Sequence, residues 1–292
     1  MSLARKYPRN IFAPSTGSCE SAQTTIMLCA FEGWNDAGSS ATEALTYLER
    51  VFSAQPLTAS LSDDFFDLST SRPLLISQDD GTGEITWPEI TMQQWENPEK
   101  TLRVISVTGP EPQLKWKQFT QELLDIAREQ AVDAVILCGG LLAEVPHTRP
   151  FPISITSYSP SLREQEGIEK QNYTGPTGIV GVLALSAAAK NLKDLSLWVS
   201  IPHYAGHPPH PKATYLLLQA LESILGISIP LHTIEEETLA WERGAAELMD
   251  EEPELARYVE QLENEQESTK LEEVSGEDIA AEFEQFLKRR DS

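Results

Sequence analysis

Residues 30–38, which read AFEGWNDAG, gather the side chains of this chain that are best suited to binding or catalysis. This segment follows an apolar run and contains Glu32, Gly33, Trp34, Asn35 and Asp36. A loop that only joins a strand to a helix needs a turn former and an N-cap, and Asn35 or Asp36 can be that N-cap. Glu32 and Trp34 exceed this need. A carboxylate and an indole at the end of a strand therefore indicate a binding site or an interface.

Three further loops carry unusual residues where a predicted strand ends. The residues concerned are Glu111, Gly139, Gly140, His147, Arg149 and His203. Ligands of parallel α/β sheets bind outside the carboxyl ends of the strands. If the four strands are parallel, we expect all four loops to share one edge of the sheet. This convergence is the main argument for a site.

Each of these loops also has a purely structural interpretation. Gly139 and Gly140 either form a tight turn or let a ligand or another chain segment approach the backbone. Arg149 lies in a rigid segment between two prolines. Its guanidinium either binds a carboxylate or phosphate through paired hydrogen bonds, or forms a buried ion pair with Glu32 or Asp36.

The sequence GPTG at residues 175–178 opens a predicted helix. Backbone N–H groups at a helix start can bind an anion, but Thr177 as an N-cap explains the same residues. His203, His207 and His210 are close in sequence, yet no carboxylate or cysteine accompanies them. We therefore expect no metal site. The chain has no G-x-S-x-G elbow, so no catalytic residue and no cofactor is predicted.

Alternating strands and helices must position these loops. Apolar runs predict four main strands, at residues 25–31, 102–107, 132–138 and 195–201. Shorter strand-like pieces are expected at residues 57–61, 73–77, 85–87 and 153–158. Helical spacing of apolar residues predicts helices from residue 37 and at residues 113–129, 177–190 and 212–225. This pattern is typical of an α/β fold with a mostly parallel sheet and helices on both faces.

Composition and charge argue against several classes of protein. Of the 292 residues, 40% are hydrophobic and 23% are charged, which is ordinary for a globular protein. No apolar stretch reaches the roughly 18–20 residues that span a bilayer, and we expect neither a signal peptide nor a membrane partner. A net charge of −23 disfavours nucleic acid as a partner. Cys29 and Cys138 lie inside predicted strands, so we expect a reducing, cytoplasmic location.

The patterns divide the chain into an N-terminal arm (1–24), an α/β core domain (25–232) and an acidic helical C-terminal region (233–292). Residues 232–292 carry 20 acidic and six basic residues, a net charge of −14. This acidic surface is either solvated or a docking surface for a basic partner. Amphipathic helical patterns at 255–262 and 279–287 need a surface to cover them, either the α/β core or another subunit. Residues 263–277 are typical of a linker.

The chain resembles the PAC2 family, which is named after the second eukaryotic proteasome assembly chaperone, and is most similar to its actinobacterial members. The matching sequences are AFEGWNDAG (30–38), WPEI (87–90), GPEP (109–112), GG to VPHTRP (139–150), GPTGIVG (175–181) and IPHYAGHPPHPKA (201–213). The resemblance implies an α/β fold similar to that of nucleoside phosphorylases, and self-association. Members are described as proteasome-assembly factors or as predicted ATP-grasp-like ligases. The family brings no settled catalytic residues.

Two hypotheses of function follow. The first is a PAC2-type assembly or interaction protein that acts as a homo-oligomer, with a trimer as one form, and binds a protein partner. The alternative is an enzyme or a protein that binds a nucleotide or phosphate-type ligand at the carboxyl ends of the strands. Its site residues would be Glu32, Asn35, Asp36, His147, Arg149 and His203. Side chains that bond only to one another would count against this alternative.

Overall fold

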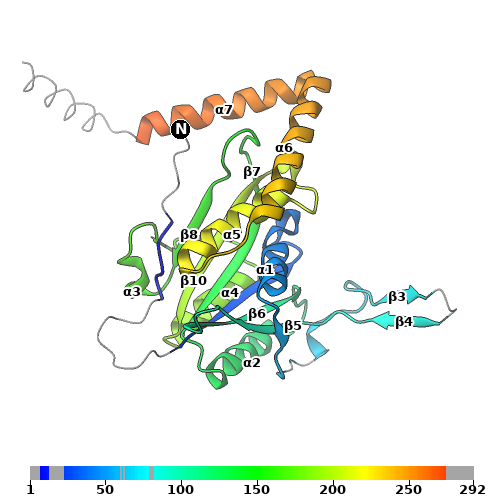
Figure 1. Ribbon diagram of the computed structural model, residues 1–292, viewed down its shortest axis with the longest axis vertical. Coiled ribbons are helices and arrows are strands. Elements are labelled where there is room, and N and C mark those ends of the chain that lie inside the picture. The colour runs from blue at the N-terminus through cyan, green and yellow to red at the C-terminus, as the bar shows by residue number, and fades with distance from the viewer. Residues whose placement is uncertain (1–6, 13–22, 60, 62, 79–81, 274–292) are drawn as a thin grey trace, which may run out of the picture.

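A mixed β-sheet runs through the centre of the molecule (Figure 1). The computed structural model describes residues 7–12, 23–59, 61, 63–78 and 82–273. Within these residues the sheet has eight strands in the order β2-β5-β6-β1-β7-β10-β8-β9. The bounds are β1 Thr24–Glu32, β2 Gln55–Pro56, β5 Thr91–Glu96, β6 Leu102–Pro110, β7 Ala134–Ala143, β8 Ile153–Ser157, β9 Glu169–Lys170 and β10 Lys193–Pro202. The four strands β6, β1, β7 and β10 are adjacent and parallel, which confirms a mostly parallel sheet.

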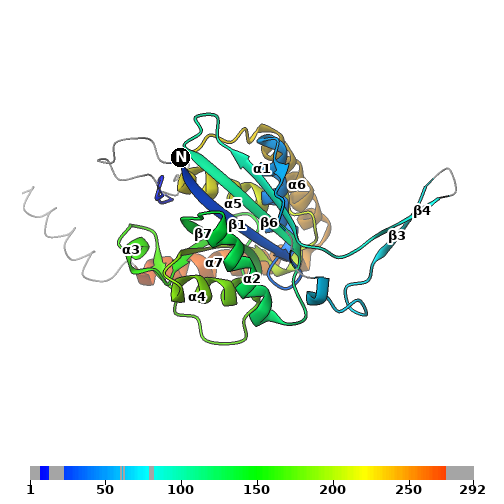
Figure 2. The same cartoon turned by 90° about the horizontal axis from the view of Figure 1, so that it is seen from below.

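Helices cover both faces of this sheet, as predicted (Figure 2). Helices α1 (Ser40–Val51) and α5 (Pro211–Leu225) pack on one face, and α2 (Trp116–Glu129) and α4 (Ile179–Ala189) on the other. A hydrophobic core lies on each face of the sheet. Because side chains alternate along a strand, β1 contributes side chains to both cores. Ile26, Leu28 and Ala30 enter one core, and Met27, Cys29 and Phe31 enter the other. A strand buried on both faces reads as a continuous apolar run, which explains why β1 was predictable.

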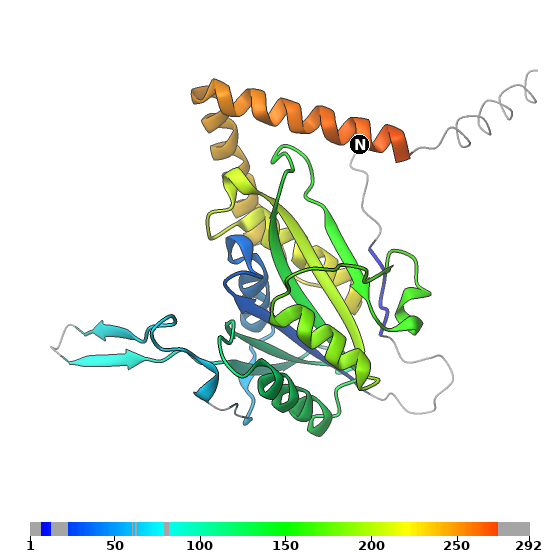
Figure 3. The ribbon, with the colours of Figure 1, turned by 180° about the vertical axis from the view of Figure 1, so that it is seen from behind.

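The C-terminal helices extend beyond the α/β layers. Helix α6 (His232–Glu251) packs on α5, and α7 (Pro253–Glu273) lies across one end of the sheet (Figure 3). Val259 and Leu262 of α7 are buried, so this amphipathic pattern is covered within its own chain. The predicted linker at residues 263–277 is wrong as far as Glu273, because the helix continues through it. The second pattern, at residues 279–287, lies outside the described residues.

A two-stranded hairpin projects from the body of the molecule as an arm (Figures 1 and 3). It consists of β3 (Leu74–Ser77) and β4 (Gly83–Thr86), which pair antiparallel. The strands predicted at 73–77 and 85–87 are therefore present, although β4 starts and ends earlier than expected. Every residue of both strands is exposed. This hairpin, residues 73–87, is called the arm below.

One strand prediction needs correction, one strand was missed, and the strand predicted at 153–158 is confirmed as β8. The strand expected at 57–61 lies earlier, as β2, because Gln55 and Pro56 pair with β5 while Leu57 and Ala59 pack irregularly on the core. Strand β5 was not predicted. Strand β8 is present but antiparallel to β10. The remaining short helices are η1 (Ala37–Ser39), η2 (Asp63–Phe65), α3 (Pro160–Arg163) and η3 (His203–Ala205).

Two further observations concern the chain's environment. Within the described residues, no helix is both long and apolar enough to cross a membrane. Cys29 and Cys138 are free and fully buried, as expected for small apolar residues. Burial raises the pKa of the Cys138 thiol to about 12, so this side chain stays protonated and unreactive at neutral pH.

Candidate functional site

The carboxyl ends of β6, β1, β7 and β10 meet at one edge of the sheet, called the rim below. The segment after β1 lies beside β7, where Asp36 forms an isolated parallel bridge with Gly140. The backbone N–H of Gly140 donates to the carbonyl oxygen of Asn35 at 2.8 Å. The loop after β6 is also joined to β1, because the N–H of Glu111 donates to the carbonyl oxygen of Glu32 at 3.3 Å.

Glu111 links three segments of the rim. Its Oε1 accepts a hydrogen bond from Asn35 Nδ2 at 2.5 Å and another from the backbone N–H of Ile179 at 2.8 Å. Ile179 is the first residue of α4, so Glu111 places a carboxylate at the start of this helix, where negative charge is favourable. The prediction that Thr177 is the N-cap is wrong, because the N-cap is Gly178. A carboxylate of the same chain occupies the place considered for an anion.

Asp36 stabilises the start of α1. Its Oδ1 accepts a hydrogen bond from the backbone N–H of Ala41 at 2.7 Å, and its Oδ2 accepts one from Thr42 Oγ1. The side chain is buried, and burial raises the pKa of Asp36 above its ordinary value although these hydrogen bonds act in the opposite direction. The role of Asp36 at the helix start thus agrees with the structural interpretation of its loop.

The first part of the same segment has a different environment. Gly33 has a φ of +96°, in the left-handed region that favours glycine, and its carbonyl oxygen accepts a hydrogen bond from the N–H of Asp36 at 3.1 Å. This turn leaves Glu32 and Trp34 exposed, with 67% of Trp34 accessible. These two side chains are therefore free to meet another molecule.

Gly139 and Gly140 lie inside β7 and not in a turn after it, so the tight-turn interpretation is wrong. A Cβ on Gly139 would lie 2.5 Å from the ring of Trp198 on the neighbouring strand β10. A Cβ on Gly140 would collide with Ser40 Oγ and lie 3.0 Å from the carbonyl oxygen of Ala37. Both glycines thus allow close approach by other parts of the same chain.

His147, Arg149 and His203 lie at the other half of the rim, where α7 covers it. The hydroxyl of Tyr204 accepts a hydrogen bond from the backbone N–H of His147 at 2.8 Å and lies 2.9 Å from its Nδ1. Arg149 Nε lies 3.6 Å from Glu263 Oε1 on α7. His203 is exposed, and its ring packs edge-on against Tyr204 and Tyr258.

A buried cluster beneath α6 was not predicted. Lys212 Nζ donates to the carbonyl oxygen of His147 at 2.6 Å and lies 2.8 Å from Glu242 Oε1 on α6. The ring of Trp241 packs 4.4 Å from that of His210, and burial lowers the pKa of His210 to about 4. The sequence signal that was available is Trp241 itself, since a tryptophan in a strongly acidic helix indicates a buried anchor.

The chemistry of the rim follows from these contacts. Asn35 Nδ2, the Asp36 carboxylate and Glu111 Oε1 form hydrogen bonds that join neighbouring loops and two helix starts. No group of three or more His, Cys, Asp or Glu side chains in the described part of the chain could hold a metal ion. The rim therefore joins loops together, and its exposed side chains face outward.

Comparison with known proteins places these features in context. A family model described as the PAC2 family matches residues 30–249. A PAC2 family protein from Streptomyces avermitilis is 38% identical, covers 80% of this chain and 99% of its own, and superposes with a TM-score of 0.75. A proteasome-assembly chaperone homologue from Mycobacterium tuberculosis is 37% identical, with the same coverage and a TM-score of 0.74. An archaeal homologue of a proteasome-assembly chaperone from Pyrococcus furiosus, 17% identical, covers 84% of this chain and 96% of its own, and shares the fold with a TM-score of 0.54. No curated protein matches the chain.

Proposed function

Because this chain belongs to the PAC2 family, we propose that it is an assembly or interaction protein that acts as a homo-oligomer and binds a protein partner. The 37% identity to a proteasome-assembly chaperone homologue supports a partner related to the proteasome. A cytoplasmic location and a trimeric state belong to the same proposal. The division of the chain into an N-terminal segment (1–24), an α/β core domain (25–232) and an acidic helical region (233–292) likewise remains a prediction.

The observation that carries this proposal is the bonding of the rim. Asn35 and Asp36 are buried, and their side chains, with that of Glu111, are engaged by neighbouring loops and helix starts. Catalysis needs groups directed at a substrate. Trp34 is instead an exposed aromatic side chain, which is common at the centre of protein interfaces.

Affinity purification at native abundance tests this proposal. The tagged full-length chain should retain proteasome subunits or their assembly intermediates in a fixed ratio, as measured by quantitative mass spectrometry. A Trp34→Ala variant should retain less of the same partner while its fold is unchanged, because this residue is exposed. Recovery of no stable protein partner by the unaltered chain would contradict the proposal.

A ligand site is the second candidate, and the exposure of Glu32 beside Trp34 favours it. A ligand that binds only the native state stabilises it by RT ln(1 + [L]/Kd), so the apparent melting temperature rises with ligand concentration. Thermal unfolding with nucleotides, nucleosides and inorganic phosphate is the test. A concentration-dependent rise in melting temperature that is lost in Trp34→Ala would favour the ligand site over the interaction protein. We expect no such rise.

A further inference from the structure

Helix α7 covers half of the rim with one narrow stripe of its surface (Figure 3). Of residues 253–266, Val259 and Leu262 are buried, and all others in that range are half-buried or exposed. The residues of the rim that contact α7 through side chains are called the covered surface below. They are Thr148, Arg149, His203 and Tyr204.

The stripe combines aromatic, apolar and charged contacts. The ring of Tyr258 packs edge-on against those of His203 and Tyr204, with centroids 5.7 and 5.9 Å apart. Further along the helix, Glu263 Oε1 lies 3.6 Å from Arg149 Nε. Helical spacing places these two residues on the same face as the buried Val259 and Leu262. The covered surface therefore recognises an amphipathic helix by an aromatic ring, two apolar side chains and a carboxylate.

An apolar side chain that borders the covered surface remains in solvent. Leu142, near the end of β7, is 54% exposed. It lies beside the segment that follows η3, because a Cβ on Gly206 would lie 2.5 Å from Leu142 Cδ2. Exposed apolar residues that adjoin one another mark interaction sites. A helix that replaced α7 and also covered Leu142 would bury more apolar surface than α7 does.

The junction between α6 and α7 lets α7 separate from the rim as a unit. Helix α6 ends at Glu251 and α7 begins at Pro253, so Glu252 joins them. Glu252 has a φ of −119° and a ψ of 83°, outside the helical region. Pro253 has no backbone N–H and cannot continue the hydrogen bonds of α6. Rotation at Glu252 therefore moves α7 away without breaking a hydrogen bond inside either helix.

Two observations indicate that α7 is an added cover over this surface. The covered surface lies within residues 30–249, which match the family model, whereas α7 follows them. In addition, α6 contains seven acidic residues and one basic residue, and α7 contains seven and two. The two helices are in contact, so their like charges repel. This repulsion opposes the contacts that hold α7 on the rim.

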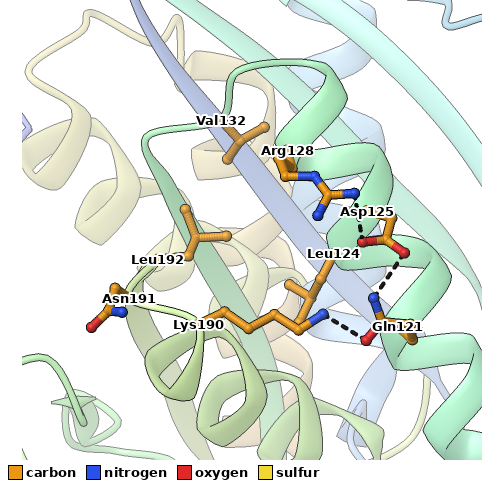
Figure 4. Close-up of a pocket in the computed structure, with 8 residues that line it drawn as sticks. All are labelled: Gln121, Leu124, Asp125, Arg128, Val132, Lys190, Asn191 and Leu192. Carbon is orange, nitrogen blue, oxygen red and sulfur yellow. Dashed lines mark hydrogen bonds and ion pairs between the residues drawn. The ribbon is translucent and has the colours of Figure 1, made fainter.

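The hollow between α2 and α4 offers a second molecule less (Figure 4). It encloses about 610 Å³, but the polar groups that line it are paired with one another. Lys190 Nζ donates to Gln121 Oε1 at 2.7 Å, and Arg128 Nη2 lies 3.1 Å from Asp125 Oδ1. These pairings occupy the charges that would recognise a ligand.

We propose that the covered surface binds the protein partner, and that α7 occupies it as an internal substitute which the partner displaces. The displacing element is an amphipathic helix with the chemistry of the α7 stripe, including a carboxylate for Arg149. This inference rests on the proposed interaction function and names its regulation. Since the competent fraction of the chain is the fraction with α7 released, the contacts of the stripe set the apparent affinity.

Thiol labelling of the folded full-length chain tests whether α7 leaves the rim. In a Cys19→Ser background, Leu262→Cys introduces a thiol where the native side chain is 4% exposed, while Cys29 and Cys138 are buried in the sheet. The new thiol should react with an aromatic disulfide reagent at least about tenfold faster than these two, because α7 opens locally. Equal rates would overturn the proposal.

A reversible cross-link tests whether release is needed for binding. In the same background, His203→Cys and Tyr258→Cys are joined by a short bis-methanethiosulfonate reagent, which dithiothreitol removes. The cross-linked chain should retain about tenfold less of the proteasome subunits that the unaltered chain retains, and reduction should restore retention. Quantitative mass spectrometry measures both, and equal retention before and after reduction would contradict the inference.

A charge reversal provides the matched comparison. Glu263→Lys places a second cation beside Arg149, so it should release α7 and raise retention several-fold. Glu260→Lys makes the same change in net charge at an exposed position of the same helix and should leave retention unchanged. Circular dichroism and melting curves show that each variant is folded. Equal effects of the two variants would assign binding to net charge and overturn the inference.

The outcomes separate this inference from the proposed function. If the unaltered chain retains proteasome subunits and the cross-linked chain retains as much, displacement of α7 is wrong while the interaction function stands. If the unaltered chain retains no protein partner, the proposed function fails, and the inference fails with it whatever the labelling rates are.

Discussion

At the rim, three polar side chains form hydrogen bonds within the fold, whereas the arm holds apolar side chains in solvent. Asn35, Asp36 and Glu111 connect loops that are far apart in sequence. Leu75 and Ile85 pair across the arm and remain exposed. The polar residues that the sequence suggests for binding or catalysis thus stabilise the fold. The plainer leucine and isoleucine residues of the arm are the ones left available to a partner.

The largest effect should come from Asp36→Ala. It removes the acceptor for the Ala41 N–H and for Thr42 Oγ1 at the buried start of α1. Hydrogen bonds to a charged group contribute about 1.5–3 kcal/mol each. Because removal of the carboxylate also relieves the cost of its burial, the free energy of unfolding should fall by less than the sum of two such bonds, about 2–4 kcal/mol, in urea titrations. Glu32→Ala, an exposed acidic residue of the same segment, is the matched control and should change it by less than about 0.5 kcal/mol. Equal losses in both variants would remove the distinction between the buried and exposed parts of the rim.

Acid should destabilise the fold through His210 of the buried cluster beneath α6, whose backbone N–H donates to the carbonyl oxygen of Gly38 at 3.0 Å. Burial lowers the pKa of His210 to about 4, below the value of about 6.5 in an unfolded chain. Between these values the unfolded chain binds more protons, so the free energy of unfolding falls as pH decreases. The contribution is at most about 3 kcal/mol. His210→Asn, which can still accept from the Ala213 N–H, should flatten this part of the pH profile. An unchanged slope of unfolding free energy against pH in this variant would contradict the assignment of the pH dependence to His210.

A smaller loss is expected from Gly140→Ala. The new Cβ would collide with Ser40 Oγ and approach the carbonyl oxygen of Ala37, and such overpacking costs about 1–3 kcal/mol. Gly244→Ala is the control, because a Cβ there meets nothing within 4 Å. Since Gly244 lies inside α6, this change should stabilise by up to about 1 kcal/mol. Thermal unfolding should show a lower melting temperature for Gly140→Ala and a higher one for Gly244→Ala than for the unaltered chain.

The smallest effect on folding should come from the arm. Leu75→Ser replaces a side chain that is 72% exposed and contributes little to either core. At the lowest protein concentration that fluorescence allows, its free energy of unfolding should match that of the unaltered chain within about 0.5 kcal/mol. A large loss would mean that the arm belongs to the folded body, and the contrast with the rim would fail.

Much of the architecture was predictable because it depends on local pattern. Residues 26–31 of β1 are all apolar, and helices such as α5 keep helical spacing of apolar residues. Leu57 and Ala59 belong to a run with apolar alternation, but they pack outside the sheet, since β5 pairs with Gln55 and Pro56 instead. Strand β5 reads TMQQWE, and its polar residues conceal an antiparallel strand.

The sequence by itself determined the α/β class, the four parallel strands and the meeting of their loops at one edge, since burial on both faces requires continuous apolar strands. Only the tertiary structure decided what those loops do. Asn35 and Glu111 are 76 residues apart, and their hydrogen bond exists because β1 and β6 are neighbours. Likewise, the exposure of Leu75 depends on where the rest of the chain lies, because an apolar side chain is buried only if the fold brings another surface to it.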